Sequence, residues 1–340
     1  MDGLLLPISK PILIGYGHHT FPLSIISQNE DYLDWVYSNY IQLYGDPVSE
    51  KIDFFTDFLI QDNLAFTSFP WLWINKVSRA DLKGQKEDLV LFLKKSLRQQ
   101  NYLYLYVDEF YLGLNRQHLL KDILIFGFDD QKKMFIILEF ENLQLNVSHV
   151  SYQDLKKAYV GFEKSYIVRN EKDQRRKSIY LIKNTSYKRY EFNLDLVKEF
   201  LMDYLNSNNS LKNFQYFSDF KGKEGFVFGI KVYEQLIQYL TELQTSPHAI
   251  NVNLFQTLFE HKKIFLLRME FMVNKGYLPN SIHIERFREI EKGALQIKNK
   301  ILRYQITLRG NLLEESVELL KQMYRDERKI LKEVLTNINK

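Results

Sequence analysis

Cysteine is absent from the 340-residue chain. Its absence excludes disulfide bonds, thiolate metal ligands and any cysteine nucleophile. The chain also lacks any stretch that approaches 18 apolar residues without a charge, so we expect no membrane span and no membrane partner. The apolar run at positions 4–7 is too short for the hydrophobic part of a secretory signal and has no basic flank. These absences favour a cytoplasmic protein.

Net charge is also small, at a formal +4, but the basic residues are unevenly placed. Between Arg169 and Arg189 there are eight Lys or Arg and only two acidic residues, and Arg175, Arg176 and Lys177 are consecutive. A basic patch attracts an acidic partner, a nucleic acid or a phosphate. The alternative is a solvated loop or hairpin. No recognisable nucleic-acid motif accompanies the patch, so we expect no nucleic-acid partner.

Aromatic residues, in contrast, are abundant: 25 Phe and 22 Tyr contribute to an aromatic content of 15%. Each such side chain buries a large area, so the sequence predicts a sizeable core. A length of 340 residues favours two domains. Strand-like alternation dominates up to about residue 190, and helical periodicity follows. We therefore expect an α+β domain over 1–190 and an α-helical bundle domain over 191–340.

Two buried-strand patterns occupy 103–107 and 123–128, where β-branched and aromatic residues are bounded by glycine and aspartate. A third strand over 133–138 should be antiparallel to the second. The polar residues that border these strands are Asp108, His118, Lys121 and Asp122. A polar side chain at the point where a loop enters a buried strand is rigid and can face a cleft, as a catalytic base requires. The alternative is the middle of a sheet with a solvated loop.

This stretch resembles a known family. The matching residues are Val107-Asp108-Glu109-Phe110-Tyr111, His118 and the run from Asp122 to Asp130. They are similar to the papain-like domain of the butirosin biosynthesis protein H N-terminal family, and to its relatives encoded beside nonribosomal peptide synthetases in Gram-positive bacteria. The resemblance implies a papain-like domain with a mostly antiparallel sheet, in which this strand carries a catalytic histidine. Lys121 occupies the position implied for that histidine, and His118 precedes it by a short loop or one helical turn.

The resemblance also implies a nucleophile at the start of the first long helix, where the helix amides favour an anion. The corresponding residues 17–24 contain two hydroxyl side chains, Thr20 and Ser24. Either would need an adjacent base such as His19, and the alternative is that both hydroxyls cap the helix. We expect no metal site here, because the side chains of neighbouring residues point apart. On the third strand, Glu139 or Glu141 holds the position of the residue that orients the base.

The second half of the chain continues the resemblance through the segments 228–233 and 260–268. Helical periodicity and turn residues predict long helices over 253–275, 284–309 and 312–338. Long antiparallel helices with short connections form a bundle.

His261 and Arg268 are seven residues apart on the first of these helices and therefore share a face. With Lys262, they could line a cleft against the first domain and hold a carboxylate or phosphate. The alternative is a satisfied ion-pair network, with Glu260 or Glu270 as the acidic partner.

By resemblance, the implied function is transfer of an acyl group from a phosphopantetheinyl carrier protein to an amine, here without a thiol. Direct aminolysis of a thioester needs a base, donors for the oxyanion and a site that orients both reactants. We expect His118 or Lys121 as the base, and the amides near His19 and Thr20 as the donors.

The alternative function is binding alone, by a catalytically inactive papain-like module that holds an acidic acyl or peptidyl carrier protein or a peptide. The missing cysteine and the lysine at position 121 favour this alternative. Under either function, the residues expected to bind the carrier or substrate are Asp108, Asp122, His261, Arg268, Arg175, Arg176 and Lys177. We expect neither a cofactor nor a metal.

Overall fold

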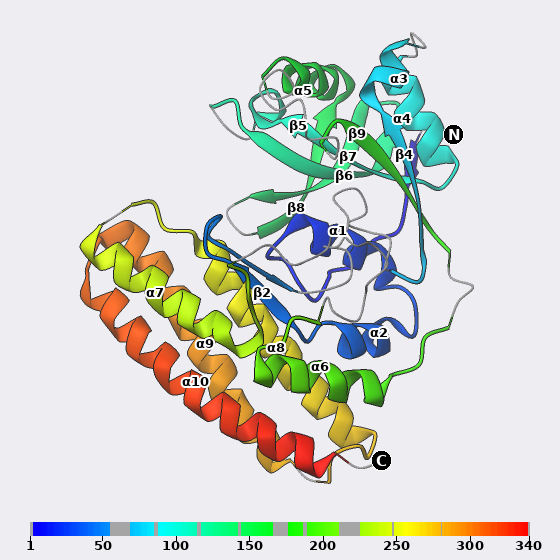
Figure 1. Ribbon diagram of the computed structural model, residues 1–340. Coiled ribbons are helices and arrows are strands. Elements are labelled where there is room, and N and C mark those ends of the chain that lie inside the picture. The colour runs from blue at the N-terminus through cyan, green and yellow to red at the C-terminus, as the bar shows by residue number, and fades with distance from the viewer. Residues whose placement is uncertain are drawn as a thin grey trace. The chain divides into compact units, whose positions relative to one another are not determined.

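The computed structural model describes residues 3–54, 69–84, 88–113, 117–141, 144–165, 176–185, 189–210, 225–246, 248–279 and 281–338. The chain forms two compact units (Figure 1). The first, called the sheet unit below, comprises Met1–Tyr32 and Gln61–Arg189. The second, the helical unit, comprises Leu33–Ile60 and Tyr190–Lys340. The predicted α+β class, antiparallel sheet and helical carboxyl-terminal region are confirmed.

The sheet unit is built on an antiparallel sheet that has seven strands in the described part of the chain (Figure 1). Its strands are β1 (Gly3–Leu5), β4 (Leu72–Ser78), β5 (Tyr102–Asp108), β6 (Leu120–Asp129), β7 (Met134–Glu141), β8 (Gln144–Ser151) and β9 (Ser178–Asn184). Their order is β4-β9-β5-β6-β7-β8, and β1 pairs with β6. The two buried-strand patterns predicted over 103–107 and 123–128 correspond to β5 and β6, which are therefore central neighbours.

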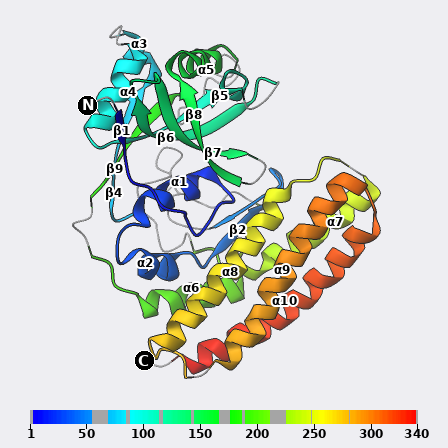
Figure 2. The ribbon, with the colours of Figure 1, turned by 180° about the vertical axis from the view of Figure 1, so that it is seen from behind.

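Helices cover both faces of this sheet (Figures 1 and 2). They are α1 (Gly17–Ile26), α3 (Arg79–Gly84), α4 (Leu89–Arg98), α5 (Tyr152–Ser165) and the 3-10 helix η2 (Glu109–Leu112). Helix α1 packs on one face, where the ring centroid of Phe21 lies 5.7 Å from that of Tyr104 and 5.5 Å from that of Phe140. Helices α4 and α5 lie over the opposite face.

Alternation along β5 and β6 decides which side chains meet which helix. Tyr104 faces α1, so Tyr106 shares its face and Val107 points to the α5 face. Cross-strand partners follow the same rule: Val107 pairs with Lys121, and Tyr106 pairs with Asp122. Lys121 therefore points to the α5 face, and Asp122 points to the α1 face.

A β-bulge interrupts the pairing of β6 with β7 between Ile125 and Gly127. On the same stretch, Gly127 pairs with Leu5 of β1. A Cβ atom at position 127 would lie 2.7 Å from the carbonyl oxygen of Leu4. Only glycine lets β1 approach β6 this closely.

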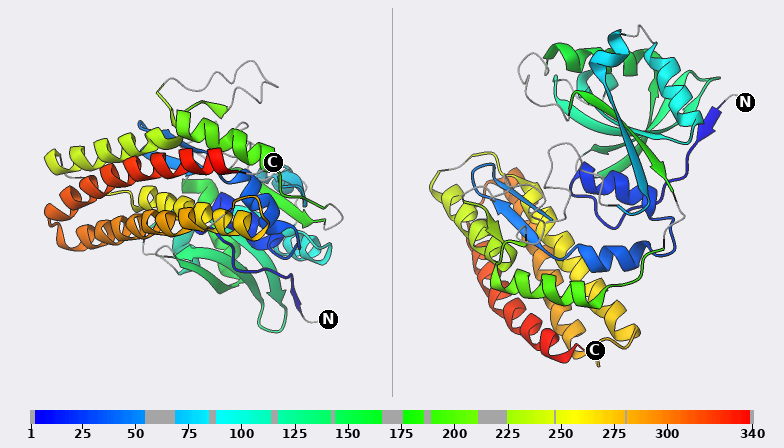
Figure 3. Two further views of the ribbon diagram at one scale, coloured as in Figure 1. Left: turned by 90° about the horizontal axis from the view of Figure 1, so that it is seen from below. Right: turned by 45° about the vertical axis from the view of Figure 1, so that its right-hand side comes forward.

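The helical unit contains the longest helices, and Figure 3 shows them running side by side. Its elements are α2 (Tyr32–Asn39), β2 (Leu43–Asp46), β3 (Lys51–Phe54), α6 (Leu194–Asn206), β10 (Val227–Phe228), the 3-10 helix η5 (Gly229–Lys231), α7 (Val232–Thr245), α8 (Val252–Asn274), α9 (Ile282–Thr307) and α10 (Asn311–Asn337). Strands β10, β2 and β3 form a small antiparallel sheet. No helix in the described ranges combines the length and apolarity that a membrane span needs.

The segment Leu33–Ile60 belongs to the helical unit, whereas the expected boundary near residue 190 placed it in the first domain. Its backbone explains the difference. The carbonyl oxygens of Tyr37 and Tyr40 accept hydrogen bonds from Arg268, each at 2.6 Å, and that of Ile41 lies 2.7 Å from His261 Nε2. A segment whose carbonyls are satisfied by α8 folds with α8.

Candidate functional site

A histidine and a buried carboxylate form a pair at the end of β5. Nδ1 of His118 lies 2.8 Å from Oδ2 of Asp108. The Asp108 side chain is 2% exposed and that of His118 is 53% exposed. The other Asp108 oxygen accepts a hydrogen bond of 3.2 Å from the backbone N–H of Phe110, at the start of η2. The strand end and the turn of η2 together fix the carboxylate.

This geometry defines the chemistry of the imidazole. A carboxylate only accepts hydrogen bonds, so Nδ1 of His118 carries the hydrogen that faces Asp108; in the neutral imidazole, Nε2 then presents its lone pair. The rings of Phe110 and Tyr111 hold the imidazole, with centroids 4.4 Å and 5.8 Å from its own. A half-exposed imidazole with a buried carboxylate behind it is the arrangement of a general base. Both residues are site candidates in the sequence, but the sequence does not predict that they pair.

Lys121 lies in a different cluster, among carboxylates. Its Nζ is 2.6 Å from Oε2 of Glu139 and 3.0 Å from Oε1 of Glu109, and the side chain is only 7% exposed. The other oxygen of Glu139 accepts a 2.9 Å hydrogen bond from the hydroxyl of Ser148. Glu139, which was expected to orient the base, thus contacts Lys121, one of the two candidate bases. Glu141 ends β7, and its side chain lies outside the described part of the structure.

The hydroxyls of α1 are committed to its backbone. Thr20 and Ser24 are both fully buried. The Thr20 hydroxyl lies within hydrogen-bond distance of the carbonyls of Tyr16 (3.0 Å) and Leu13 (3.1 Å), and Ser24 donates to that of Phe21 (2.7 Å). Buried hydroxyls that satisfy local carbonyls are structural. Neither Thr20 nor Ser24 has the exposure that a nucleophile requires, so that expectation is wrong.

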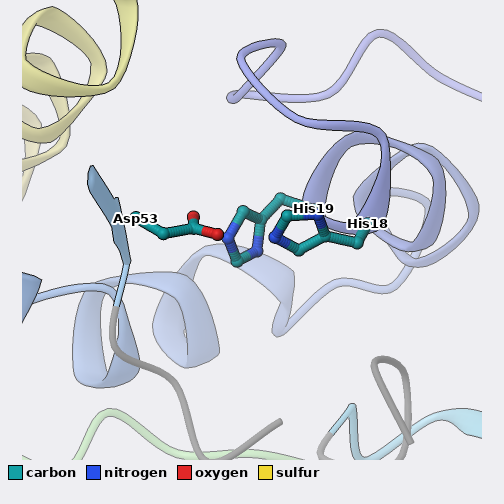
Figure 4. Close-up of side chains that lie close together, drawn as sticks. All are labelled: His18, His19 and Asp53. Atoms are coloured by element: carbon teal, nitrogen blue, oxygen red, sulfur yellow. The ribbon is translucent and has the colours of Figure 1, made fainter. Parts of the chain in front are cut away.

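The two histidines in the first turn of α1 are His18 and His19 (Figure 4). Their ring centroids are 4.3 Å apart, with planes tilted by 47°. The expectation that these neighbouring side chains point apart is therefore wrong. His18 also stacks on Tyr16, at 5.4 Å between centroids. These contacts hold the two imidazoles together at the beginning of the helix.

The sheet separates α1 from both candidate bases. Helix α1 covers the face to which Tyr104 points, whereas Lys121 points to the other face. The pair of His118 and Asp108 lies beside α5, since Oδ2 of Asp108 would be 3.0 Å from a Cβ on Gly161 of α5. Asp108 is the last residue of β5 and the N-cap of η2, so it does not follow the alternation that places Tyr104 and Tyr106 on the α1 face. The expected arrangement, in which either base acts beside the amides that begin α1, is therefore wrong.

The group that does meet the start of α1 is Asp122. Its Oδ2 would lie 2.2 Å from a Cβ at position 17, so only the glycine found there leaves room for the carboxyl. The hydroxyl of Tyr104 donates to the same oxygen at 3.2 Å and lies 2.8 Å from that of Tyr106. Burial raises the pKa of Asp122, and it raises that of Tyr104 well above 10. Alternation along β5 and β6, applied to residue 122, was the signal that could have located this cluster.

The basic segment is described only in part. Arg175 lies outside the described residues. The guanidinium of Arg176 lies 5.7 Å from the ring centroid of Tyr106, which brings it to the Asp122 cluster. Lys177 precedes β9, and its carbonyl accepts a 3.1 Å hydrogen bond from the N–H of Arg79.

His261 and Arg268 belong to the interior of the helical unit. His261 is fully buried and Arg268 is 1% exposed. Nζ of Lys262 lies 2.8 Å from Glu327 Oε1, 2.8 Å from the Tyr204 hydroxyl and 3.1 Å from Nδ1 of His261. These three partners match the three hydrogens of an ammonium.

The proposed cleft for a carboxylate or phosphate is therefore wrong, and the alternative of an ion-pair network is confirmed for Lys262. Its acidic partner is Glu327 of α10, rather than Glu260 or Glu270. Arg268 instead binds the two carbonyls at the end of α2 that were described above, where a cation complements the helix dipole.

Comparison with known proteins gives no match to any protein-family model and none to the curated proteins.

Proposed function

We propose that the sheet unit is a papain-like domain without a thiol, and that the chain is an accessory protein of nonribosomal peptide or related natural-product biosynthesis. In this proposal it transfers an acyl group from a carrier protein to an amine, in the cytoplasm. The observation that carries the proposal is the pair of His118 and Asp108, 2.8 Å apart, with a half-exposed imidazole and a buried carboxylate. The resemblance of the stretch 107–130 supplies the substrate class.

The reaction is direct aminolysis of the carrier thioester. Nε2 of His118 takes a proton from the amine as the nitrogen attacks the thioester carbonyl. Asp108 stabilises the imidazolium that forms, and the same imidazolium then protonates the departing sulfur. The C–S bond breaks, a C–N bond forms, and the products are an amide and the free carrier thiol. No acyl-enzyme is needed, which agrees with the absence of cysteine and the buried hydroxyls of α1.

The other residues of the sheet unit have supporting roles in this proposal. Phe110 and Tyr111 form apolar walls beside the imidazole, and they orient it toward the reactants. Lys121 forms ion pairs with Glu109 and Glu139, and in this proposal it does not act as a base. Arg176 and Lys177 provide positive charge for an acidic carrier protein. The reaction as written needs no cofactor.

A second candidate is a catalytically inactive module that binds a carrier protein or a peptide. The specific observation in its favour is that the positions implied for the base and the nucleophile are both occupied by groups with structural contacts. Lys121 forms ion pairs with two carboxylates, and the buried Thr20 hydroxyl lies within hydrogen-bond distance of the carbonyls of Leu13 and Tyr16.

One experiment separates the two candidates. The protein is incubated with an acyl-loaded carrier protein and a panel of amines, and the free carrier thiol and the amide are measured by mass spectrometry. His118→Gln is compared with His149→Gln, a matched control, because His149 is an exposed histidine of β8 on the same sheet. The proposal predicts a loss of about a hundredfold or more for His118→Gln and an unchanged rate for His149→Gln.

The remaining outcomes decide between the candidates. Turnover that survives His118→Gln refutes the proposed base, and turnover that is lost in Lys121→Met but not in His118→Gln assigns that role to Lys121. Binding of the carrier protein without turnover by the wild type supports the inactive module. Failure to bind any carrier protein or peptide contradicts both candidates.

A further inference from the structure

At the edge of the sheet formed by β4, an exposed tryptophan lines a groove that the proposed reaction does not use. The groove has a volume of about 530 Å³ and is lined by Trp73, Asn75, Gln99, Asn101, Lys183 and Thr185. Trp73 and Lys183 are directly opposite one another on β4 and β9. All six residues belong to the sheet unit.

The exposure of Trp73 needs an explanation, because its indole is a large apolar surface. The chain has three tryptophans. Trp35 and Trp71 are 3% and 1% exposed, whereas Trp73 is 61% exposed. An indole that forms the wall of a groove offers a flat apolar platform with an N–H at its edge.

The polar groups around this platform have unused hydrogen-bonding capacity. The side chains of Asn75, Gln99 and Lys183 have no hydrogen-bond partner within the ranges that the structure describes. Asn101 uses one N–H on the carbonyl of Ser96, and its amide oxygen stays available. Thr185 donates to the carbonyl of Trp71 and can still accept. Each amide offers a donor beside an acceptor, which suits neighbouring hydroxyls that also donate and accept.

We propose that this groove binds a pyranose ring that carries a carboxylate, such as a hexuronate. The apolar face of the ring stacks on Trp73, and its hydroxyls hydrogen-bond to Asn75 and Gln99. The carboxylate meets Lys183, the one cation in the described lining, which contains no acidic residue. A single lysine matches one negative charge, so a uronate fits better than the phosphate of a nucleotide, although a base could also stack on an indole.

The intrinsic fluorescence of the full chain tests this proposal, because Trp73 is the exposed indole. Methyl β-glucuronide should give a saturable change with a Kd of about 1 mM, the range expected for a small polar ligand. Methyl β-glucoside, which lacks the charge, should bind about tenfold more weakly, since a hydrogen bond to a charged group is lost. Lys183→Met should remove the difference between the two sugars. Lys83→Met, which changes an exposed lysine of α3, should preserve it.

Trp73→Phe removes the fluorescent reporter, so its affinity is measured by calorimetry, and the proposal predicts weaker binding of the glucuronide. The absence of a saturable signal in the wild type overturns the proposal. Equal affinity for the charged and neutral sugars overturns the role of Lys183, and tighter binding of AMP than of the glucuronide overturns the assignment to a sugar. The titration involves no acyl transfer, so its result is independent of whether His118 is a catalytic base.

Discussion

Replacing Glu327 by glutamine removes the counter-charge of a lysine that is buried in the helical unit. Glu327 and Lys262 are both fully buried, and their charged atoms are 2.8 Å apart. Glu327 also accepts hydrogen bonds from Tyr204 at 3.1 Å and from Tyr233 at 2.6 Å. Four elements, α6, α7, α8 and α10, therefore meet at one carboxylate.

The expected loss in the free energy of unfolding follows from the groups that the variant leaves without a partner. Glutamine keeps one acceptor oxygen where the carboxylate offers two, so it can accept from only one of the two oxygen positions that Tyr204 and Tyr233 use. The charge of Lys262 then has no opposing charge in this network. Removing one partner of a buried ion pair costs about 3–5 kcal/mol. Because Lys262 retains the Tyr204 hydroxyl and Nδ1 of His261, we expect about 3 kcal/mol, at the lower end of that range.

Urea denaturation followed by circular dichroism measures this cost, and hydrogen exchange of the α8 amides assigns it to the helical unit. The matched control is Glu315→Gln, which breaks an exposed lysine–glutamate contact between α9 and α10 and should cause no measurable change. Combining Lys262→Met with Glu327→Gln should cost about 2 kcal/mol less than the sum of the single changes. Additive effects, or equal effects of Glu327→Gln and Glu315→Gln, would refute the reasoning.

Two further predictions concern pH and packing. Burial, aided by Lys262, lowers the pKa of His261 well below 6.5, so the unfolded chain takes up a proton that the folded chain does not. The urea concentration at the midpoint of unfolding should therefore decrease as the pH is lowered from about 6.5. The midpoint should also decrease as the pH is raised above about 10. Burial raises the pKa of Tyr233 well above that value, so only the unfolded chain ionises there. A midpoint that is independent of pH would contradict both statements. Gly17→Ala should destabilise the sheet unit by about 1–3 kcal/mol through its clash with the Asp122 carboxyl. Gly310→Ala should cause no such loss of stability, because a Cβ at position 310 meets no atom within 4 Å. Equal effects of the two substitutions on thermal unfolding would contradict this prediction.

The sequence predicted the long helices closely because their signals are local. The pattern over 253–275 corresponds to α8 (Val252–Asn274), and those over 284–309 and 312–338 correspond to α9 (Ile282–Thr307) and α10 (Asn311–Asn337). Apolar residues at helical spacing, with Gly276 and Gly310 beyond the helix ends, are sufficient for such predictions. In contrast, the membership of the segment 33–60 depends on contacts with residues more than 200 positions away, and local patterns carry no such information.

The site was predicted as a set of residues, not as an arrangement. His118 and Asp108 were both candidates, yet their contact depends on how η2 turns after β5. The resemblance implies position 121 as that of the catalytic histidine, whereas strand alternation directs the neighbouring Asp122 toward α1. A shift of one residue along a strand exchanges the two faces of a sheet, so a motif alone does not determine which side chain meets a helix.

The central claim is that Asp108 holds His118 as the base for acyl transfer from a carrier protein to an amine. The most direct measurement is the rate at which Asp108→Asn releases carrier thiol, with its affinity for the loaded carrier measured in parallel. We predict that the rate falls by about a hundredfold or more while the affinity stays that of the wild type. A variant that releases thiol at the wild-type rate would contradict the account.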